Sequence, residues 1–578
     1  MTTFAHETGL PALPLPRCDT LPAILPGLLA PLVDKTILDK SLHELQHFLA
    51  GDGAKLEQAL KEWQGQQPGN ASWLNALWEK DYLSFAEPLP INMNYFFLLD
   101  EKWHFSAGGL LSALVTVMQR LSRQELPPEM VKESALSMHQ FRTMWYSRLP
   151  MPHCDTLHTV PLGGLVTATV VCNGHWHILP LSDASGQPFT ARAIETALDA
   201  LRTASLADKP APLGALTTAN RNVAIALRAN LLASEQNRLN LAALENSAIV
   251  ICLDDAVDGT TNLCRNALCG PSANRWYAKS IQLICPQNGP LGLNFEHAGC
   301  DASAWGHLLT MATKTIRENN ENQPYAHGSP KARPLLWSLS EEVEMELQRL
   351  EAAHTAQVQA LDLCVIGPDP RFGKESIKAL KCSPDAFVQM AMQYAQLAVF
   401  GEFVSCYEAF SMRHFAQGRT ECARPSSLQA KTLAQAIDKE KDSLGTLFAA
   451  AAEEHGKRLA LCHKGEAIER LLYGLKQMYA LYGNTLGIET KPAFFNDPGL
   501  VALGHNRLST SSLAIPFVSH FGFGPVEPDG LGTGYLVQTD AVSLVITGFK
   551  GSSPKACDFA SAFIHGATTQ AMALTPGE

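Results

Sequence analysis

The octapeptide Asn294-Phe-Glu-His-Ala-Gly-Cys-Asp301 contains residue types that can move a proton. His297 stands directly after an apolar run, and a neutral imidazole accepts a proton near neutral pH. Asp301, four residues later, can fix the tautomer of the histidine or order the loop that holds it. The window alone leaves open whether His297 is catalytic or structural. Cys300, between the two, could be a nucleophile, which we disfavour because no other feature indicates an activated thiol.

The flanking residues predict how this octapeptide is held. Residues 276–284 alternate in character and indicate a strand, and Gln287-Asn-Gly289 is typical of a turn. Residues 291–295 then indicate a second strand. His297 is therefore expected just beyond a strand end, where a rigid element can present a loop residue.

Further elements follow from local patterns. The first 80 residues and residues 187–246 are expected to be mainly helical. Short strands are expected over residues 162–181, with a turn at Asn173-Gly174, and a buried strand over residues 248–253. The cluster Gly530-x-Gly532-x-Gly534 is expected to be a loop and not a dinucleotide fingerprint, because no helical pattern follows it.

A polar stretch, residues 318–334, is the best candidate for a linker. After it, Ser340 suits the N-cap of a long helix that begins with acidic residues. We therefore expect an N-terminal domain over residues 1–335 and a C-terminal domain over residues 336–578.

Composition limits the class of protein. The chain has 578 residues, of which 46% are hydrophobic and 17% charged, as expected for globular domains with large cores. The net charge of -11 argues against nucleic-acid binding as the main role. Neither a transmembrane run nor a targeting signal is recognisable, so a cytoplasmic location is expected. The 14 cysteines lack a Cys-x-x-Cys pair and are expected to be buried, reduced thiols.

A basic stripe stands out in this acidic chain. If the stretch is one helix, its side chains share a face, and Ser383-Pro384-Asp385 then starts a new helix with an N-cap, a proline at N1 and an acid in the first turn. A basic face beside a helix N-terminus suits a phosphate-bearing ligand, although an ordinary solvated face is the alternative. The stripe consists of Arg371, Lys374, Lys378 and Lys381.

Together, these motifs resemble the carnitine/choline O-acyltransferases, from about Leu13 to about Phe559. The likeness rests on many segments in the order of the family, not on one motif. The segments are Met138-His-Gln-Phe-Arg142, Arg148-Leu-Pro150, Asn274-Arg-Trp276, Lys279-Ser280, Asn294-Phe-Glu-His297, Phe372-Gly-Lys374, Ser383-Pro-Asp-Ala-Phe387, Tyr407-Glu408, Gly418-Arg-Thr420, Leu508-Ser-Thr-Ser511, Phe523-Gly-Pro-Val526 and Pro528-Asp-Gly530.

The resemblance implies an α/β fold of two similar chloramphenicol-acetyltransferase-like domains, each a mixed sheet packed with helices, and an active-site tunnel at their interface. It implies a general base, His297, and direct attack on the acyl carbonyl without an acyl-enzyme. Asp301 is implied to pair with Arg419 as an anchor of the loop. Ser511 is implied to stabilise the oxyanion, although a Ser/Thr run is by itself also typical of a polar turn.

The resemblance also implies how the substrates bind. Tyr407, Thr420, Arg470 and Ser509 match carnitine positions, and Arg470 stands where choline enzymes have a neutral residue, although Leu471 replaces the usual histidine. Lys374, Lys378 and Asp385 match coenzyme A positions. Ser512 replaces the usual glutamine and puts a contact to the pantetheine arm in doubt.

The resemblance further implies that a residue just before Phe-Gly-Pro gates the acyl pocket. Counting from Ser511 without gaps places Phe521 at this gate, which favours short or medium chains. A shift of one residue selects Gly522 and gives the opposite conclusion. Acyl-CoA is then a co-substrate, with no permanently bound cofactor or metal, and a monomer is expected. The rival readings are a choline O-acetyltransferase and a silent acyl-CoA-binding protein on the same fold.

Overall fold

A computed structural model describes residues 2–204, 210–318, 324–439 and 443–575. The chain divides into two units, and each unit is assembled from three separate segments. The first comprises Met1–Glu7, Glu79–Leu361 and Ile515–Gly524, and the second comprises Thr8–Trp78, Asp362–Ala514 and Pro525–Glu578. Helix α4 (Asn75–Ser84) carries the chain from the second unit into the first.

These units differ from the domains expected on either side of residue 335. Helix α11 (Glu341–Ala360) belongs to the first unit, where Arg265 donates hydrogen bonds to the carbonyl oxygens of Val358 at 3.1 Å and Leu361 at 2.8 Å. The N-terminal helices belong to the second unit, since Lys431 binds the carbonyl oxygen of Pro31 at 2.7 Å. The division follows contacts between segments that are distant in sequence. The composition of a candidate linker does not reveal such contacts.

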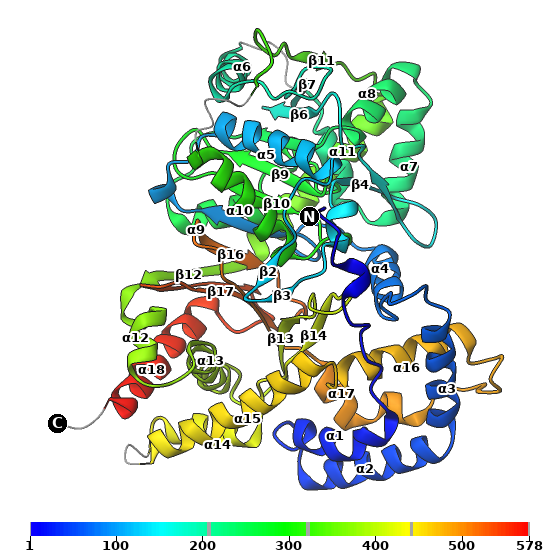
Figure 1. Cartoon of the computed structure of the whole chain (residues 1–578), viewed down its shortest axis with the longest axis vertical. Coiled ribbons are helices and arrows are strands. Elements are labelled where there is room, and N and C mark those ends of the chain that lie inside the picture. The colour runs from blue at the N-terminus through cyan, green and yellow to red at the C-terminus, as the bar shows by residue number, and fades with distance from the viewer. Residues whose placement is uncertain (1, 205–209, 319–323, 440–442, 576–578) are drawn as a thin grey trace. The chain divides into compact units, whose positions relative to one another are not determined.

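The first unit is built on an eight-stranded mixed sheet in the order β11-β7-β6-β8-β9-β10-β1-β16. Strand β6 is parallel to β8, and β8 is parallel to β9, while the other neighbours are antiparallel. Helices α5 and α10 lie side by side (Figure 1). The bounds are β1 Tyr95–Leu99, α5 Ala107–Ser122, β2 Met130–Val131, β3 Ser134–Ala135, β4 Tyr146–Leu149, β5 Thr156–Thr159, β6 Thr167–Cys172, β7 His175–Pro180, α6 Ala191–Thr203, α7 Arg221–Leu232, α8 Glu235–Glu245, β8 Ile249–Leu253, α9 Thr260–Cys269, β9 Ile281–Cys285, β10 Gly292–Phe295, α10 Ala302–Glu318, β11 Arg333–Leu335 and β16 Val518–Phe523.

The second unit contains a six-stranded mixed sheet in the order β12-β18-β17-β15-β13-β14. Strands β13, β15 and β17 are parallel, and the pairs β13–β14 and β17–β18 are antiparallel. The bounds are α1 Leu21–Leu29, α2 Lys35–Ala50, α3 Asp52–Gly65, β12 Leu361–Asp369, α12 Lys374–Ala379, α13 Pro384–Phe400, β13 Cys406–Ser411, β14 Thr420–Cys422, α14 Leu428–Ala436, α15 Leu444–Lys464, α16 Glu469–Tyr482, α17 Pro498–Gly504, β15 Leu508–Leu513, β17 Leu531–Val537, β18 Val542–Phe549 and α18 Ala556–Leu574. The predicted α/β class with two mixed sheets and packed helices is confirmed.

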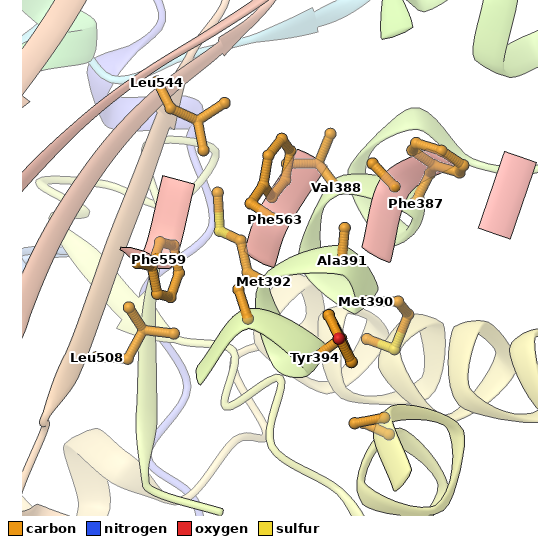
Figure 2. Packing of buried hydrophobic residues seen from close by; sticks show 14 of the residues in the cluster. Phe387, Val388, Met390, Ala391, Met392, Tyr394, Leu508, Leu544, Phe559 and Phe563 are labelled. Atoms are coloured by element: carbon orange, nitrogen blue, oxygen red, sulfur yellow. The ribbon is translucent and has the colours of Figure 1, made fainter. Parts of the chain in front are cut away.

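Apolar side chains of α13 and α18 form much of one hydrophobic core of the second unit, together with residues of the sheet (Figure 2). Phe387 and Val388 of α13 are fully buried, as are Phe559 and Phe563 of α18. Burying a large apolar side chain contributes roughly 1.5–3 kcal/mol. This core fixes α13, whose N-terminal turn holds Asp385.

Local signals placed several elements correctly. The Ser340 hydroxyl accepts a hydrogen bond from the backbone N–H of Val343, as a cap of α11 should. Asn173 and Gly174 have φ angles of 48° and 77° and close the β6–β7 hairpin as expected. The expected loop at the glycine cluster is wrong, because Gly532 and Gly534 lie within β17.

One expectation about cysteines also fails. Cys364 of β12 and Cys557 of α18 form a disulfide, with 5.3 Å between their Cα atoms. The partners are 193 residues apart, so spacing does not reveal the pair. Separately, no helix among the described residues is both long and apolar enough to cross a membrane.

Candidate functional site

His297 follows β10 in the first unit, as predicted. Its imidazole is 30% exposed and lies against two tyrosine rings. The ring centroid of Tyr95 is 4.9 Å away and that of Tyr82 is 5.2 Å away. Tyr95 is in β1 beside Phe295, so the sheet itself brings one of these rings to the histidine. The arrangement restrains the imidazole and leaves part of it accessible.

Asp301 is hydrogen-bonded to the side-chain amide of Gln140. Its carboxylate accepts a hydrogen bond from Gln140 Nε2 at 2.9 Å, and its N–H donates to Gln140 Oε1 at 2.7 Å. The distance from Asp301 Oδ1 to His297 Nδ1 is 3.8 Å, longer than a hydrogen bond. Asp301 therefore anchors its own loop. Its predicted partner, Arg419, is a buried residue of the second unit, and their pairing stays a prediction.

A buried polar network holds the residue before the histidine. The Glu296 carboxylate is fully buried and accepts hydrogen bonds from Tyr146 Oη at 2.5 Å and Arg148 Nη1 at 2.9 Å. It also accepts from the N–H of Ala298 at 3.0 Å, and the N–H of Gly299 donates to Tyr146 Oη at 3.0 Å. These bonds fix the backbone on both sides of His297. Cys300 is fully buried in the same turn, which does not favour a nucleophilic role.

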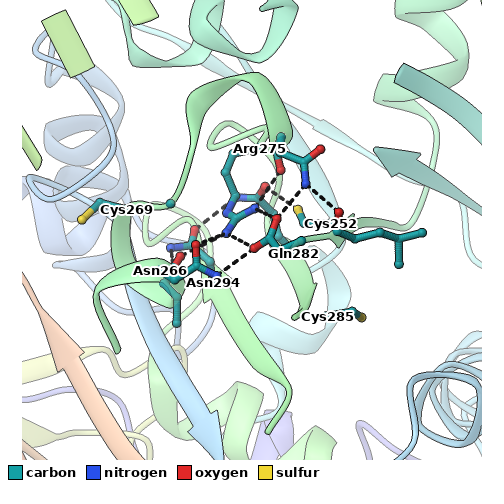
Figure 3. Close-up of polar contacts among 12 residues, drawn as sticks. Cys252, Asn266, Cys269, Arg275, Gln282, Cys285 and Asn294 are labelled. Atoms are coloured by element: carbon teal, nitrogen blue, oxygen red, sulfur yellow. Dashed lines mark hydrogen bonds and ion pairs between the residues drawn. The ribbon is translucent and has the colours of Figure 1, made fainter. Parts of the chain in front are cut away.

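A second buried network holds β10 against α9 and β9 (Figure 3). Arg275 donates to both carboxylate oxygens of Asp254, at 2.8 and 2.6 Å. Burial by itself raises the pKa of Asp254, but the Arg275 guanidinium brings that pKa below its ordinary value. Asn294 of β10 donates to the carbonyl oxygens of Ala267 and Leu268, both at 3.0 Å. The strand that ends at the catalytic candidate is thus rigidly held.

Phe521 occupies β16, the strand next to β1. It is registered with Phe97, while Gly522 is registered with Phe96. Because residues alternate along a strand, Phe521 shares a sheet face with Tyr95, which contacts His297. Phe521 is 3% exposed, and its ring centroid is 6.3 Å from that of Tyr95. Of the two candidate gate residues, Phe521 and not Gly522 therefore lies on the sheet face that carries Tyr95 and His297.

In the second unit, Arg470 joins two predicted carnitine residues. Its Nη2 donates to Tyr407 Oη at 2.8 Å and to Thr420 Oγ1 at 3.2 Å. The guanidinium lies over the ring of Trp78, 4.0 Å from its centroid. The side chain of Arg470 is only 8% exposed. This is a desolvated cation surrounded by hydroxyl groups, a combination that suits a carboxylate ligand.

Strand β15 carries the Ser-Thr-Ser motif. Ser509 and Ser511 are registered with Gly532 and Gly534 of β17, so all four positions face one side of the sheet. The two glycines therefore place no side chain beside the serines. Thr510 faces the opposite side and is fully buried. The motif is therefore a strand and not a polar turn.

The basic stripe is not one helix. Residues 370–372 form a short 3-10 turn, α12 ends at Ala379, and Lys381 has a φ angle of 59°. Lys374 and Lys378 stand four residues apart in α12 and share a face, and Lys378 is half exposed with Glu375 Oε1 3.5 Å away. Two of the four basic residues of the predicted stripe, Lys374 and Lys378, therefore share one helix face.

Asp385 occupies the first turn of α13, and the Ser383 hydroxyl caps that helix as predicted. The carboxylate of Asp385 is 38% exposed. It contacts His455 Nε2 at 2.8 Å and accepts a hydrogen bond from Tyr535 Oη at 3.1 Å. Neither partner was singled out from the sequence, because each is more than 60 residues away along the chain.

The chain belongs to the Choline/Carnitine o-acyltransferase family, which it matches over residues 13–564. It is therefore an acyltransferase by family. It is 28% identical to carnitine O-palmitoyltransferase 2, mitochondrial, from Bos taurus, over 96% of this chain and 90% of that protein. It is 27% identical to carnitine O-acetyltransferase from Columba livia, over 94% and 90% of the two chains. A more distant likeness, with a TM-score of 0.39 and 9% identity, is to the condensation domain from Monacolin K polyketide synthase MokA, over 87% of this chain and 97% of that one.

These findings confirm the family inferred from the motifs. The roles of individual residues stay predictions. Sequence reasoning did not single out Tyr82, Tyr95 or the Tyr146–Glu296 hydrogen bond, although an acid inside the apolar run before His297 was a usable signal.

Proposed function

We propose that this protein catalyses the reversible transfer of an acyl group between coenzyme A and the hydroxyl of carnitine. The observation that carries the proposal is the buried cluster of Arg470, Tyr407 and Thr420. Carnitine has a carboxylate and choline has none, and a desolvated guanidinium beside two hydroxyls recognises a carboxylate.

The charge balance around Arg470 supports this specificity. The nearest carboxylate, Glu421 Oε1, is 4.0 Å from Arg470 Nε. Burial raises the pKa of Glu421 to about 7, although the Arg470 guanidinium opposes that shift. Glu421 is then only a partial counter-ion near neutral pH. The positive charge remains available to a ligand carboxylate.

The reaction begins with the imidazole of His297, which removes the proton from the carnitine hydroxyl. The oxygen attacks the acyl carbonyl, and the tetrahedral intermediate collapses with release of the coenzyme A sulfur. The imidazolium returns its proton to that sulfur. Acyl-CoA and carnitine thus give acylcarnitine and coenzyme A, without an acyl-enzyme. In the reverse direction His297 deprotonates the thiol.

The remaining residues assist these steps. Ser511 donates a hydrogen bond to the oxyanion, an effect of roughly 3 kcal/mol for one well-placed donor. Ser509 contacts carnitine, and Asp301 with Arg419 orders the loop that carries His297. Lys374 and Lys378 bind the 3′-phosphate of coenzyme A, and Asp385 contacts its adenine side.

One assay tests the function. Purified protein is given acetyl-CoA or octanoyl-CoA with carnitine or with choline, and release of free thiol is followed. We expect release that depends on carnitine and is at least tenfold slower with choline. Equal or faster release with choline would make it a choline acyltransferase, and binding of coenzyme A without any transfer would make it a silent binding protein.

A further inference from the structure

Glu408 of β13 is a buried carboxyl group with no part in the proposed chemistry, and it is 4% exposed. The register sets Glu408 beside Thr510 of β15. Tyr535 of β17 reaches the same carboxyl, so all three side chains lie on one face of the sheet. Helix α13 covers that face with Gln389 and Asp385.

The oxygen atoms of this group make more close contacts than its two hydroxyl protons can fill. Tyr535 Oη lies 3.0 Å from Glu408 Oε1 and 3.1 Å from Asp385 Oδ1. Thr510 Oγ1 lies 2.8 Å from the carbonyl oxygen of Tyr407 and also contacts Glu408 Oε2. Two hydroxyl protons thus serve four oxygen–oxygen contacts. If both carboxyls are ionised, two contacts lack a proton, which is costly in a buried site. A proton on Glu408 fills a third contact.

The surroundings favour that proton. Burial raises the pKa of Glu408 to about 8, and the charge of Asp385 adds to the shift, while hydrogen bonds from Thr510, Tyr535 and Gln389 oppose it. The titratable groups that face Glu408 are Asp385 on α13, Tyr535 on β17 and Cys406 on its own strand. His455 of α15 lies beyond them, paired with Asp385.

We propose that Glu408 acts in acyl transfer as a positioning residue in its neutral form, fixing Thr510 so that Ser509 and Ser511 keep their places on the opposite face of β15. Thr510 stands between the two serines in β15, so a shift of its backbone moves both of them. Their side chains point to the opposite face because neighbouring residues of a strand alternate in direction. The part that concerns the serines rests on the proposed function, whereas the protonation of Glu408 does not.

The pH dependence has a definite sign. A carboxyl group whose pKa is higher in the folded protein than in the unfolded chain binds more protons when folded. Glu408 therefore contributes stability below its ordinary pKa of 4.5, and this contribution is lost as the pH rises toward about 8. The Glu408→Gln variant keeps a neutral group of the same shape and has no such loss.

Two variants and a control test the proposal with full-length protein. Glu408→Gln should keep kcat within about threefold of wild type, while Glu408→Ala should lower kcat at least tenfold with a smaller change in KM. Between pH 6 and pH 9, wild type should lose several degrees more in Tm than Glu408→Gln. The control, Glu344→Gln, removes an exposed carboxylate on α11 and should follow the wild-type profile.

The outcomes separate this proposal from the function. Loss of activity in Glu408→Gln as large as in Glu408→Ala would overturn it, because the charged form would then be required. Parallel Tm profiles of wild type and Glu408→Gln would overturn the neutral state. If wild type transfers no acyl group to carnitine, the proposed function fails, and the Tm profiles still decide the protonation of Glu408.

Discussion

The Arg148 guanidinium and the Glu296 carboxylate form a buried ion pair directly before His297, with Nη1 and Oε1 2.9 Å apart and neither side chain more than 1% exposed. Breaking a buried pair by removing one charge typically costs 3–5 kcal/mol. Glu296→Gln should therefore lower the free energy of unfolding by about 3 kcal/mol and also lower kcat. Denaturant unfolding measures the first effect. Glu346→Gln, which breaks the exposed pair with Arg349, should change stability by less than about 1 kcal/mol.

His297→Ala should abolish transfer while leaving the fold intact, because the imidazole is 30% exposed. Loss of a general base lowers kcat by roughly 10² to 10⁴. The dissociation constant of coenzyme A should stay within about threefold, as measured by calorimetry. A variant that retains more than about a tenth of wild-type kcat contradicts the mechanism.

Arg470→Gln should weaken carnitine selectively. A charge-assisted contact to a carboxylate is lost, so KM for carnitine should rise at least about tenfold, while KM for acyl-CoA stays within about twofold. Tm must be followed as well, because the cation is buried. Arg349→Gln, an exposed guanidinium paired with Glu346, is the matched control and should leave both constants unchanged. An unaltered carnitine KM in Arg470→Gln removes the argument for specificity.

Phe521→Gly should lengthen the accepted acyl chain. The phenylalanine shares a sheet face with Tyr95 near His297, so its removal opens space on that side. The ratio of kcat/KM for palmitoyl-CoA to that for acetyl-CoA should increase by about tenfold or more. Gly522 faces the other way, and Gly522→Ala should shift this ratio much less. If the two variants behave alike, Phe521 is not the gate.

Local patterns predicted much of the fold. The caps at Ser340 and Ser383 and the Asn173-Gly174 hairpin depend on neighbouring residues and were correct. The strand before His297 was also correct. Such features need no knowledge of the rest of the chain.

The failures involve long-range packing. Cys364 and Cys557 pair across 193 residues, and no spacing rule finds such a pair. Glu408 is recognisable only once three strands and a helix bring its partners together. The glycine cluster was expected to be a loop because no helical pattern follows it, but Gly532 and Gly534 lie in β17 beside the serines of β15.

The strand β16 is part of the first unit, although residues of the second unit precede and follow it. Its partner β1 ends at Leu99, so more than 400 residues separate the two strands in translation. At about 5–20 residues per second, a ribosome needs roughly 20–90 s to deliver β16 after β1. Until then one edge of β1 is unpaired, and an unpaired edge can recruit other chains. No single cut in the gene can therefore separate the two units. A nascent chain also depends on protection of the unpaired edge of β1 until the last tenth of the chain is made.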